Sequence, residues 1–189
     1  GDVSVLSFDP TKNLPNYGSG GMVLTDSASM WESVMDMRNN GKPGNHCDWG
    51  TNSRMSESDC AQMLVKLKYF DQWQERRTKI ADYYTSRLMT YVDPVLPGPG
   101  VVSAWHKYVI KTESRSSLRD HLMHQGIEAK IHYEVPLYEH VVGYPYINYA
   151  SELYREASAF CSECLSLPIY PEMTDSEVEY VVETISKFG

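Results

Sequence analysis

The residue best placed to do chemistry in this sequence is Lys12, which follows a break in a strand-like segment. The apolar run over residues 3–8 is typical of a buried strand, and the segment ends at Pro10. Rigid backbone there would hold a lysine partly out of water, which disfavours the charged ammonium form and favours the amine. Such an amine can attack a carbonyl carbon and form a Schiff base. The alternative is a solvated lysine in an exposed turn.

Two neighbouring features fit the same chemistry. Ser7 lies five positions before the lysine, so its hydroxyl is placed to bind a phosphate group near the amine. The alternative for Ser7 is a strand-edge hydroxyl that bonds its own backbone. Residues 18–21 form a glycine-rich turn that leads into a second apolar strand. The order strand, lysine turn, glycine turn and strand predicts a hairpin with the lysine at its mouth.

Composition and length are those of an ordinary globular domain. The chain has 189 residues, of which 42% are apolar, enough for a core. The formal net charge of −8 argues against nucleic acid as a partner, although local basic groups can still bind a nucleotide-linked sugar. No apolar stretch is long enough to span a bilayer, and no signal segment is evident. We therefore expect a cytoplasmic protein without a membrane partner.

The four cysteines include one CxxC motif, formed by Cys161 and Cys164. A structural zinc site usually needs four ligands, and neither a second CxxC nor a pair of histidines accompanies this one. We therefore expect no metal site here. Half-buried free thiols near a helix end, in a reducing compartment, are the preferred interpretation.

The elements that must position these residues follow from the hydrophobic pattern. A helix capped by Asp26 or Ser27 is expected to stop at Gly41, and a loop of unusual length follows over 41–55. Loops of that length are more often functional than idle. A long helix over 56–90, with a kink or short break, is expected because apolar residues recur at three- and four-residue spacing.

Beyond a Pro/Gly-rich stretch at 94–100 the pattern predicts a smaller α/β unit. The expected elements are strands over 104–112 and 127–135, helices over 117–125 and 150–164, an extended piece over 165–170, and a helix that begins at the capping box 174–177. The predicted division is thus residues 1–55 with the lysine hairpin, 56–93 as a linking helix, and 94–189 as a small domain.

Five ordered groups of residues resemble the pyridoxal-phosphate-dependent sugar aminotransferases of the DegT/DnrJ/EryC1/StrS family. The first is Ser-Phe-Asp-Pro-Thr-Lys-Asn-Leu at 7–14, followed by Gly-Ser-Gly-Gly-Met-Val-Leu-Thr at 18–25. The others lie at 37–41, 50–57, 131–137 and 165–171. One such motif alone is weak, but five in the family's order, covering the chain nearly end to end, are a strong signal.

The resemblance implies roles for residues of the first half of the chain. Lys12 matches the family lysine that forms the Schiff base with pyridoxal 5′-phosphate and then serves as the acid/base of the reaction. Ser7 matches the phosphate-binding serine. Asn52 matches an asparagine that reaches across a dimer interface to the neighbouring cofactor phosphate, although a turn asparagine with left-handed backbone is the alternative. Arg54 could bind an anionic group of the substrate or hold its own loop.

In the second half, His132 and Tyr133 match a His-Tyr pair that faces the substrate sugar. A histidine among apolar strand residues is, however, often a satisfied structural group, and both interpretations stay open for His132. The implied fold is α/β, the C-terminal portion of a fold-type-I aminotransferase. It would contain remnant strands of the large domain, a long linking helix, and a small domain with a mostly antiparallel sheet.

The family's reaction transfers an amino group from an amino acid, usually glutamate, to a nucleotide-linked keto-sugar. Relatives run to about twice this length, and the chain begins just before the lysine segment. We therefore expect the N-terminal half of the family fold, which precedes the lysine segment, to supply three things. These are the carboxylate that pairs with the nitrogen of the cofactor ring, the aromatic side chain that stacks on that ring, and most of the parallel sheet. Residues 1–189 alone should be inactive or weakly active. A homodimer, or pairing with a chain that supplies the N-terminal half, is expected. The alternative is a non-catalytic assembly or binding module derived from that fold.

Overall fold

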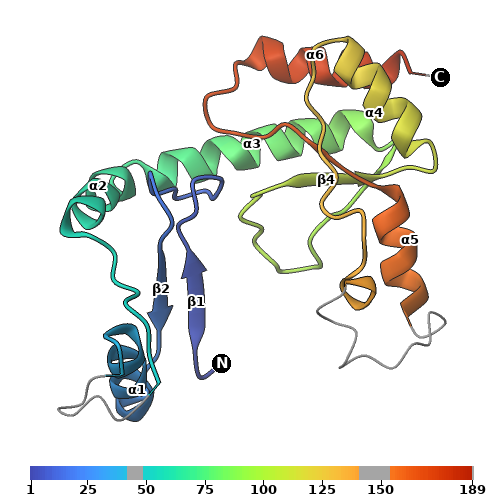
Figure 1. The fold of residues 1–189 in the computed structure, drawn as a ribbon. Coiled ribbons are helices and arrows are strands. Elements are labelled where there is room, and N and C mark those ends of the chain that lie inside the picture. Colours follow the sequence, from blue (N-terminus) through green and yellow to red (C-terminus); the bar gives the residue numbers. More distant parts are fainter. Residues whose placement is uncertain (42–48, 141–153, 189) are drawn as a thin grey trace. The chain divides into compact units, whose positions relative to one another are not determined.

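The computed structural model describes residues 1–41, 49–140 and 154–188 (Figure 1). The chain divides into two compact units, Gly1–Gln72 and Trp73–Gly189. Both contain helices and a small antiparallel sheet, so the chain has the expected α/β class. The boundary between the units falls inside the predicted linking helix, and the three-part division at residues 55 and 93 stays a prediction.

The first unit begins with an antiparallel hairpin of two strands, β1 (Ser4–Ser7) and β2 (Gly21–Leu24). Beyond the strands, the Phe8 amide donates to the Gly20 carbonyl at 2.8 Å. The Asn16 amide donates to the Phe8 carbonyl, also at 2.8 Å, and closes the lysine turn. The hairpin predicted around this turn is confirmed.

The prediction that the strand before the lysine is buried is wrong for the described part of the chain. Every residue of β1 and β2 is exposed, and Val5 reaches 75% exposure. A strand is buried only when layers pack on its faces, and a two-stranded hairpin supplies no such layer by itself. The apolar composition of these strands is therefore not matched by burial within this unit.

Helix α1 (Ala28–Arg38) follows the hairpin. Its N-terminal cap is Ser27, whose hydroxyl accepts from the Met30 amide at 3.3 Å. The choice that the sequence left open between Asp26 and Ser27 is thus settled in favour of Ser27. The chain turns away at Asn40, which adopts a left-handed φ of 63°.

The predicted loop after α1 is fastened to the end of that helix. Residues 42–48 lie outside the described part of the chain. Farther along, the Thr51 amide donates to the Met37 carbonyl at 2.8 Å, and the Ser53 amide donates to the Arg38 carbonyl at 3.0 Å. The second half of this loop therefore has a defined place beside α1.

The predicted long helix is two helices, α2 (Glu57–Leu67) and α3 (Phe70–Leu88), so the short break that the pattern allowed lies between them. Ser56 caps α2, and its hydroxyl accepts from the Asp59 amide at 3.1 Å. At the break, the amides of Lys68 and Tyr69 donate to carbonyls three residues earlier, which tightens the last turn of α2.

The second unit contains a three-stranded antiparallel sheet in the order β3 (Asp93–Pro94), β4 (Tyr108–Lys111) and β5 (Cys164–Leu167). β4 lies within the strand predicted over 104–112. The short strand β3 was not predicted, because two residues are too few for a periodic pattern.

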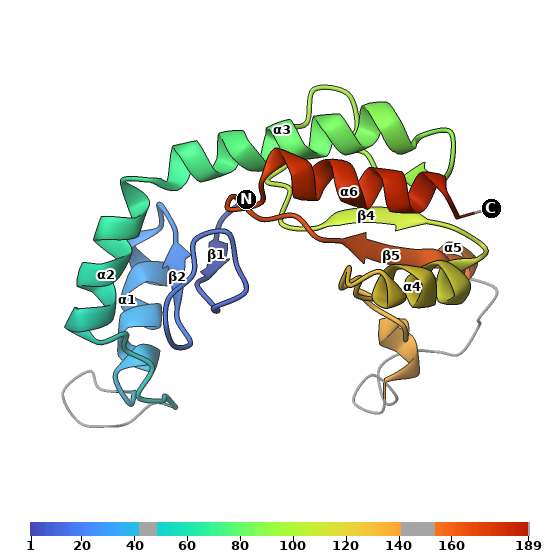
Figure 2. The ribbon, with the colours of Figure 1, turned by 90° about the horizontal axis from the view of Figure 1, so that it is seen from above.

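Helices cover both faces of this sheet. Figure 1 shows α4 (Arg115–His124) and α6 (Asp175–Ser186) on one side of β4 and α5 (Arg155–Glu163) on the other. Residues 150–153 of the helix predicted over 150–164 lie outside the described residues. Figure 2 shows α3, α4 and α6 from above, running beside the strands.

The core of the second unit lies among the sheet, α3, α4 and α6. Its most deeply buried side chains come from all of these elements and include Ile80, Ala81, Tyr84, Leu88, Tyr108, Ile110, Leu118, Leu122, Leu165 and Ile185. Removal of this much apolar surface from water is the main favourable term in the folding of the unit.

The strand predicted over 127–135 does not form. Only Lys130 pairs with the sheet, through an isolated bridge in which it and Ser166 exchange two backbone hydrogen bonds of 2.7 and 3.1 Å. β5 ends at Leu167, and Pro168 has no N–H with which to continue the ladder. The segment therefore pairs with the sheet backbone at one residue only and is otherwise irregular.

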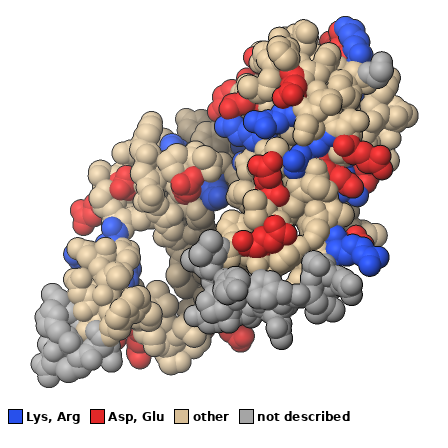
Figure 3. Space-filling model, turned by 45° about the vertical axis from the view of Figure 1, so that its right-hand side comes forward, with Lys and Arg blue, Asp and Glu red and all other residues tan. Residues whose placement is uncertain are grey.

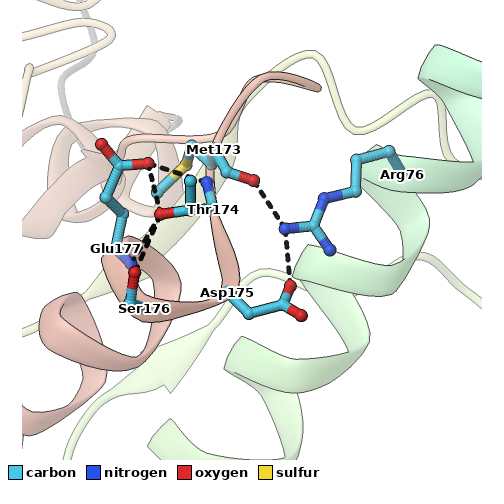
Figure 4. Close-up of polar contacts among 6 residues, drawn as sticks. All are labelled: Arg76, Met173, Thr174, Asp175, Ser176 and Glu177. Carbon is cyan, nitrogen blue, oxygen red and sulfur yellow. Dashed lines mark hydrogen bonds and ion pairs between the residues drawn. The ribbon is translucent and has the colours of Figure 1, made fainter.

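A capping box starts α6, as the sequence predicts (Figure 4). The Thr174 hydroxyl accepts from the Glu177 amide at 3.2 Å, and the Glu177 carboxylate accepts from the Thr174 amide at 2.7 Å. Arg76 on α3 donates to the Met173 carbonyl at 2.6 Å and pairs with Asp175 at 2.7 Å. These contacts fix the start of α6 against α3.

Substitution Thr174→Ala is expected to lower the free energy of unfolding by about 1 kcal/mol, because the N-terminal amides of α6 lose their acceptor. Thr174→Ser, which keeps the hydroxyl, should stay within a few tenths of a kcal/mol of the parent. Urea denaturation followed by circular dichroism measures both values. Equal loss in the two variants would show that the hydroxyl is not what stabilises this helix.

The same box makes stability depend on pH. Hydrogen bonds from the Thr174 amide and hydroxyl lower the pKa of Glu177 below its ordinary value. A lowered carboxyl pKa stabilises the folded state above the ordinary pKa, and this contribution is lost as pH falls through the lowered value. The stability difference between the parent and Glu177→Gln should therefore be present at about pH 7 and be lost as the pH falls through the lowered pKa of Glu177. A stability difference between the parent and Glu177→Gln that stays the same at neutral and at acidic pH would contradict this.

Candidate functional site

The turn that holds Lys12 is ordered by the aspartate that precedes it. The Asp9 carboxylate accepts from the Thr11 amide at 3.0 Å and from the Thr11 hydroxyl at 2.7 Å. These two hydrogen bonds, with the nearby charge of Lys12, lower the pKa of Asp9. The Lys12 amide in turn donates to the Asp9 carbonyl at 2.9 Å. The backbone of the lysine is therefore fixed directly after β1.

The Lys12 side chain itself is uncommitted. The residue is half-buried, and its terminal nitrogen makes no hydrogen bond or ion pair within the described ranges. The amine is therefore free of a fixed carboxylate partner, and in its neutral form a lysine amine can attack a carbonyl carbon.

The rest of the lysine turn is docked on α2 within the first unit. Lys66 donates to the Pro15 carbonyl at 2.7 Å, and its ammonium lies 4.4 Å from the centre of the Tyr17 ring. Asn16 is 2% exposed, and its side-chain amide has no hydrogen-bond partner in the described part of the chain. The turn therefore has support on the side of α2.

Ser7 ends β1, and its hydroxyl accepts from the Asp9 amide at 3.4 Å. This contact is the local bond that the alternative interpretation expected, but it is long and therefore weak. It occupies one lone pair and leaves the hydroxyl proton for an acceptor such as a phosphate oxygen. Ser7 and Lys12 thus lie in the same hairpin, one at the end of a strand and one in the turn.

Asn52 and Arg54 are brought together in the loop beside α1. The Arg54 guanidinium donates to the Asn52 side-chain oxygen at 3.4 Å, and both residues are exposed. Asn52 forms a backbone bridge with Asn39 and has no positive φ, so it is not the left-handed turn residue of the alternative; Asn40 is. The contact to Asn52 gives Arg54 a part in holding its own loop.

His132 and Tyr133 lie in the second unit, next to the Lys130 bridge. His132 Nδ1 lies 2.9 Å from the Ser166 hydroxyl, and burial, with the charges of Lys107 and Lys130, lowers the pKa of His132. Tyr133 is 71% exposed, with its ring edge-on to the imidazole. His132 therefore has the structural partner of the alternative interpretation, while Tyr133 faces water.

The contacts that order these groups were not singled out from the sequence. Ser166 meets His132 across 34 positions of sequence, which no local pattern reveals. Asp9 could have been found, because an aspartate two residues before a threonine after a strand is typical of a side-chain-closed turn.

Two of the hollows in the described part of the chain lie away from these residues. One of about 650 Å³ in the first unit is apolar and is lined by β1, β2, α1 and the following loop. One of about 440 Å³ in the second unit is lined by Lys107, Lys130, Ser166, Tyr180 and their neighbours. None of the residues predicted for the site lines either hollow.

The described cysteines are free. Cys60 is exposed, Cys161 half-buried and Cys164 buried, and Cys47 lies outside the described residues. Burial, reinforced by the neighbouring thiol, raises the pKa of Cys164. In the ranges that the structure describes, no three His, Cys, Asp or Glu side chains are grouped as a metal site requires. Nor does any helix there combine the length and apolarity needed to cross a bilayer.

A family model, the DegT/DnrJ/EryC1/StrS aminotransferase family, matches residues 1–186. The chain is 36% identical to the pleiotropic regulatory protein of Geobacillus stearothermophilus, over all of this chain and 52% of that protein. It is 33% identical to the dTDP-3-amino-3,4,6-trideoxy-alpha-D-glucose transaminase of Streptomyces venezuelae, over 99% of this chain and 50% of the relative. The chain thus spans about half the length of the curated relatives it matches.

Solved structures agree with this likeness. The S. venezuelae protein DesV, in complex with a ketimine intermediate, superposes with a TM-score of 0.92 at 32% identity, covering all of this chain and 52% of that one. An aminotransferase from Brucella abortus superposes with a TM-score of 0.89 at 29% identity, covering all of this chain and 51% of that one. The fold of the chain is therefore that of about half of such an enzyme.

Proposed function

The chain belongs to the DegT/DnrJ/EryC1/StrS aminotransferase family, and from this we propose that it is the lysine-bearing half of a pyridoxal-phosphate-dependent sugar aminotransferase. The completed enzyme would transfer an amino group from an amino acid, glutamate, to a nucleotide-linked keto-sugar. The observation that supports this most is the uncommitted amine of Lys12 in an ordered turn, within a family match over residues 1–186.

The residues present fit one end of pyridoxal 5′-phosphate. A primary amine suits its aldehyde, and a serine hydroxyl and an asparagine amide are neutral donors that suit its phosphate. Lys12 would hold the aldehyde end, Ser7 the phosphate, and Asn52 the phosphate of a neighbouring subunit. When bound, the cofactor supplies an electron sink that stabilises negative charge at the substrate carbon.

Lys12 would have a second role once the substrate is bound. Its amine would take a proton from the substrate carbon and deliver it to the C4′ carbon of the cofactor, which requires a base on a flexible stem. Arginine cannot serve, because its guanidinium stays protonated at all working pH values.

His132, Tyr133 and Arg54 would contact the substrate. The lowered pKa of His132 favours an uncharged imidazole near neutral pH, which recognises a sugar through hydrogen bonds instead of charge. Tyr133 offers an exposed hydroxyl, and the Arg54 guanidinium suits a nucleotide phosphate.

We propose that the chain acts in the cytoplasm as a homodimer or with a chain that supplies the N-terminal half, without membrane or nucleic-acid partners. The surface in Figure 3 supports the expectation that nucleic acid is not a partner, because basic and acidic side chains are interspersed on the face drawn. The first unit supports pairing: both strands of its hairpin are exposed, α1 has no buried residue, and Trp31 is 57% exposed. Exposed apolar strands of this kind favour association with another chain.

Val5→Asp is expected to weaken this association. Val5 is 75% exposed on β1, so the substitution buries no charge within the chain but places one on the surface that a partner would cover. Analytical ultracentrifugation should find the parent chain self-associated at micromolar concentration and the variant shifted toward monomer. Val102→Asp, at a 96% exposed position of the second unit, is the matched control and should behave like the parent. A parent chain that stays monomeric, alone and with an N-terminal half, would contradict the proposed pairing.

Turnover tests the function. The chain should be co-expressed with a polypeptide that supplies the N-terminal half of the family fold, and given pyridoxal 5′-phosphate, glutamate and a nucleotide-linked keto-sugar. We expect amino-sugar product from the assembly and at most feeble activity from the chain alone. An assembly that forms but shows neither product nor cofactor uptake would favour the non-catalytic module instead.

A further inference from the structure

The hydroxyl of Ser166 is held against the imidazole of His132 by the sheet of the second unit. Ser166 is 5% exposed, lies in β5, and has Val109 of β4 as its partner in the register. On its other side it exchanges two backbone hydrogen bonds with Lys130, two residues before the histidine. Both the hydroxyl and the ring it meets at 2.9 Å are therefore tied to one strand.

We propose that Ser166 is a positioning residue that fixes His132 as the neutral tautomer with its proton on Nε2. This inference rests on the proposed function, in which His132 faces the substrate sugar, and it assigns the chemical form in which the ring would do so.

The direction of the hydrogen bond follows from the count of donors. A serine hydroxyl has one proton to donate, and within the described residues the only partner of the Ser166 hydroxyl is His132 Nδ1. If Nδ1 carried a proton and donated, the hydroxyl proton of Ser166, which is 5% exposed, would have no acceptor among the described residues. Buried polar groups rarely stay unsatisfied, so the hydroxyl donates and Nδ1 accepts.

The surrounding charges favour the same form. Lys107 and Lys130 both oppose a positive charge on the ring, and partial burial opposes it further. The nearest carboxylate in sequence, Glu134, lies 3.5 Å from Arg115 and is paired with it. The Tyr133 ring stands edge-on to the imidazole, and the Cys164 thiol, whose pKa is raised by burial, donates to the Tyr133 carbonyl at 3.8 Å.

The tautomer of His132 determines which ligand groups its ring can bind. With Nδ1 occupied by Ser166, the group left for a ligand is an uncharged N–H donor at Nε2. Such a donor suits a sugar hydroxyl, a sugar carbonyl or a phosphate oxygen. It does not suit the ammonium group of an amino-acid donor, which has no acceptor to offer. His132 would therefore bind an acceptor oxygen of a ligand, whether it belongs to a sugar, a phosphate or a carboxylate.

Nuclear magnetic resonance of the ¹⁵N-histidine-labelled chain tests this without cofactor or turnover. Long-range ¹H–¹⁵N correlation spectra distinguish the two ring nitrogens, and His132→Gln assigns the signals. In the parent we expect a protonated Nε2 and an unprotonated Nδ1 at neutral pH. Ser166→Ala should populate both tautomers and raise the titration midpoint of His132 by about half a unit to one unit, because the neutral form loses its donor.

Three comparisons make the result specific. Ser166→Thr keeps the hydroxyl and should restore the parent tautomer. Ser162→Ala, on α5, removes a hydroxyl that donates to the Ala159 carbonyl and should leave His132 unchanged. The signals of His121, which lies against the Thr184 carbonyl, should stay constant in every variant.

A parent spectrum with the proton on Nδ1, or a charged ring at about pH 7, would overturn the proposal on its own, even if Ser166→Ala failed to fold. So would a tautomer that is unchanged in Ser166→Ala. These outcomes are distinguishable from a failure of the proposed function. Lys12 can fail as the reactive amine while the tautomer of His132 is as described, and Lys12 can be the reactive amine while the tautomer of His132 is the other one.

Discussion

Lys12→Ala is expected to lower kcat for amino-group transfer by the completed assembly at least about a thousandfold, because both the amine that holds the cofactor and the base that moves the proton are lost. Its turn, closed by Asp9 and docked through Lys66, does not depend on the lysine side chain. The variant should therefore fold, and it should still bind the nucleotide-linked sugar. Steady-state kinetics with a saturating amino donor measures the loss.

Two controls separate chemistry from charge. Lys12→Arg keeps the positive charge but not the nucleophile, so its kcat should be nearly as low as that of the alanine variant. Lys68→Ala removes an exposed lysine at the end of α2 in the same unit and should keep the parent rate. A Lys12→Ala assembly that turns over as fast as the parent would remove the basis of the proposed function.

The largest expected effect on stability is that of Tyr84→Ala, which should lower the free energy of unfolding of the second unit by about 3–5 kcal/mol. Tyr84 is fully buried on α3, and its ring stands edge-on to that of Tyr108 with 5.1 Å between centres. Its hydroxyl donates to the Pro168 carbonyl at 3.0 Å, and burial raises the pKa of Tyr84 far above its ordinary value. The substitution removes packing and the hydrogen bond together.

Tyr84→Phe isolates the hydrogen bond and should be destabilised by about 1–2 kcal/mol, because the ring stays in place. Urea denaturation of both variants, followed by tyrosine and tryptophan fluorescence, gives the two values. If Tyr84→Ala lost no more than the phenylalanine variant, the core would not depend on this ring, and the packing described for α3 would be wrong.

Local chemistry made several elements predictable from the sequence. Ser27, Ser56 and the Thr174 box cap their helices through contacts that span three residues, so the signal lies within a short window. The hairpin around Lys12 was predictable for the same reason, because its strands lie close together in the sequence.

Features that depend on distant partners were not predictable. The segment over 127–135 has a strand-like pattern, but its partner β5 is four residues long and is followed by Pro168, so only Lys130 pairs. The burial expected for β1 is not found, because every residue of both hairpin strands is exposed in the described part of the chain.

In the candidate site, too, features with local causes were predictable and those with distant partners were not. The place of Lys12 in a turn follows from the proline that ends its strand, and the family resemblance supplies its chemistry. The link from His132 to Ser166 joins residues 34 positions apart and becomes visible only in the folded chain. The side chain that fixes a ring is thus harder to predict than the ring itself.

Covalent mapping of the cofactor tests the central claim most directly. The completed assembly would be incubated with pyridoxal 5′-phosphate, reduced with borohydride, digested and analysed by mass spectrometry. We predict one cofactor-modified peptide, with the modification on Lys12, and no modified peptide from Lys12→Ala. A modification on any other lysine of this chain, or active assembly in which Lys12 stays unmodified after reduction, would contradict it.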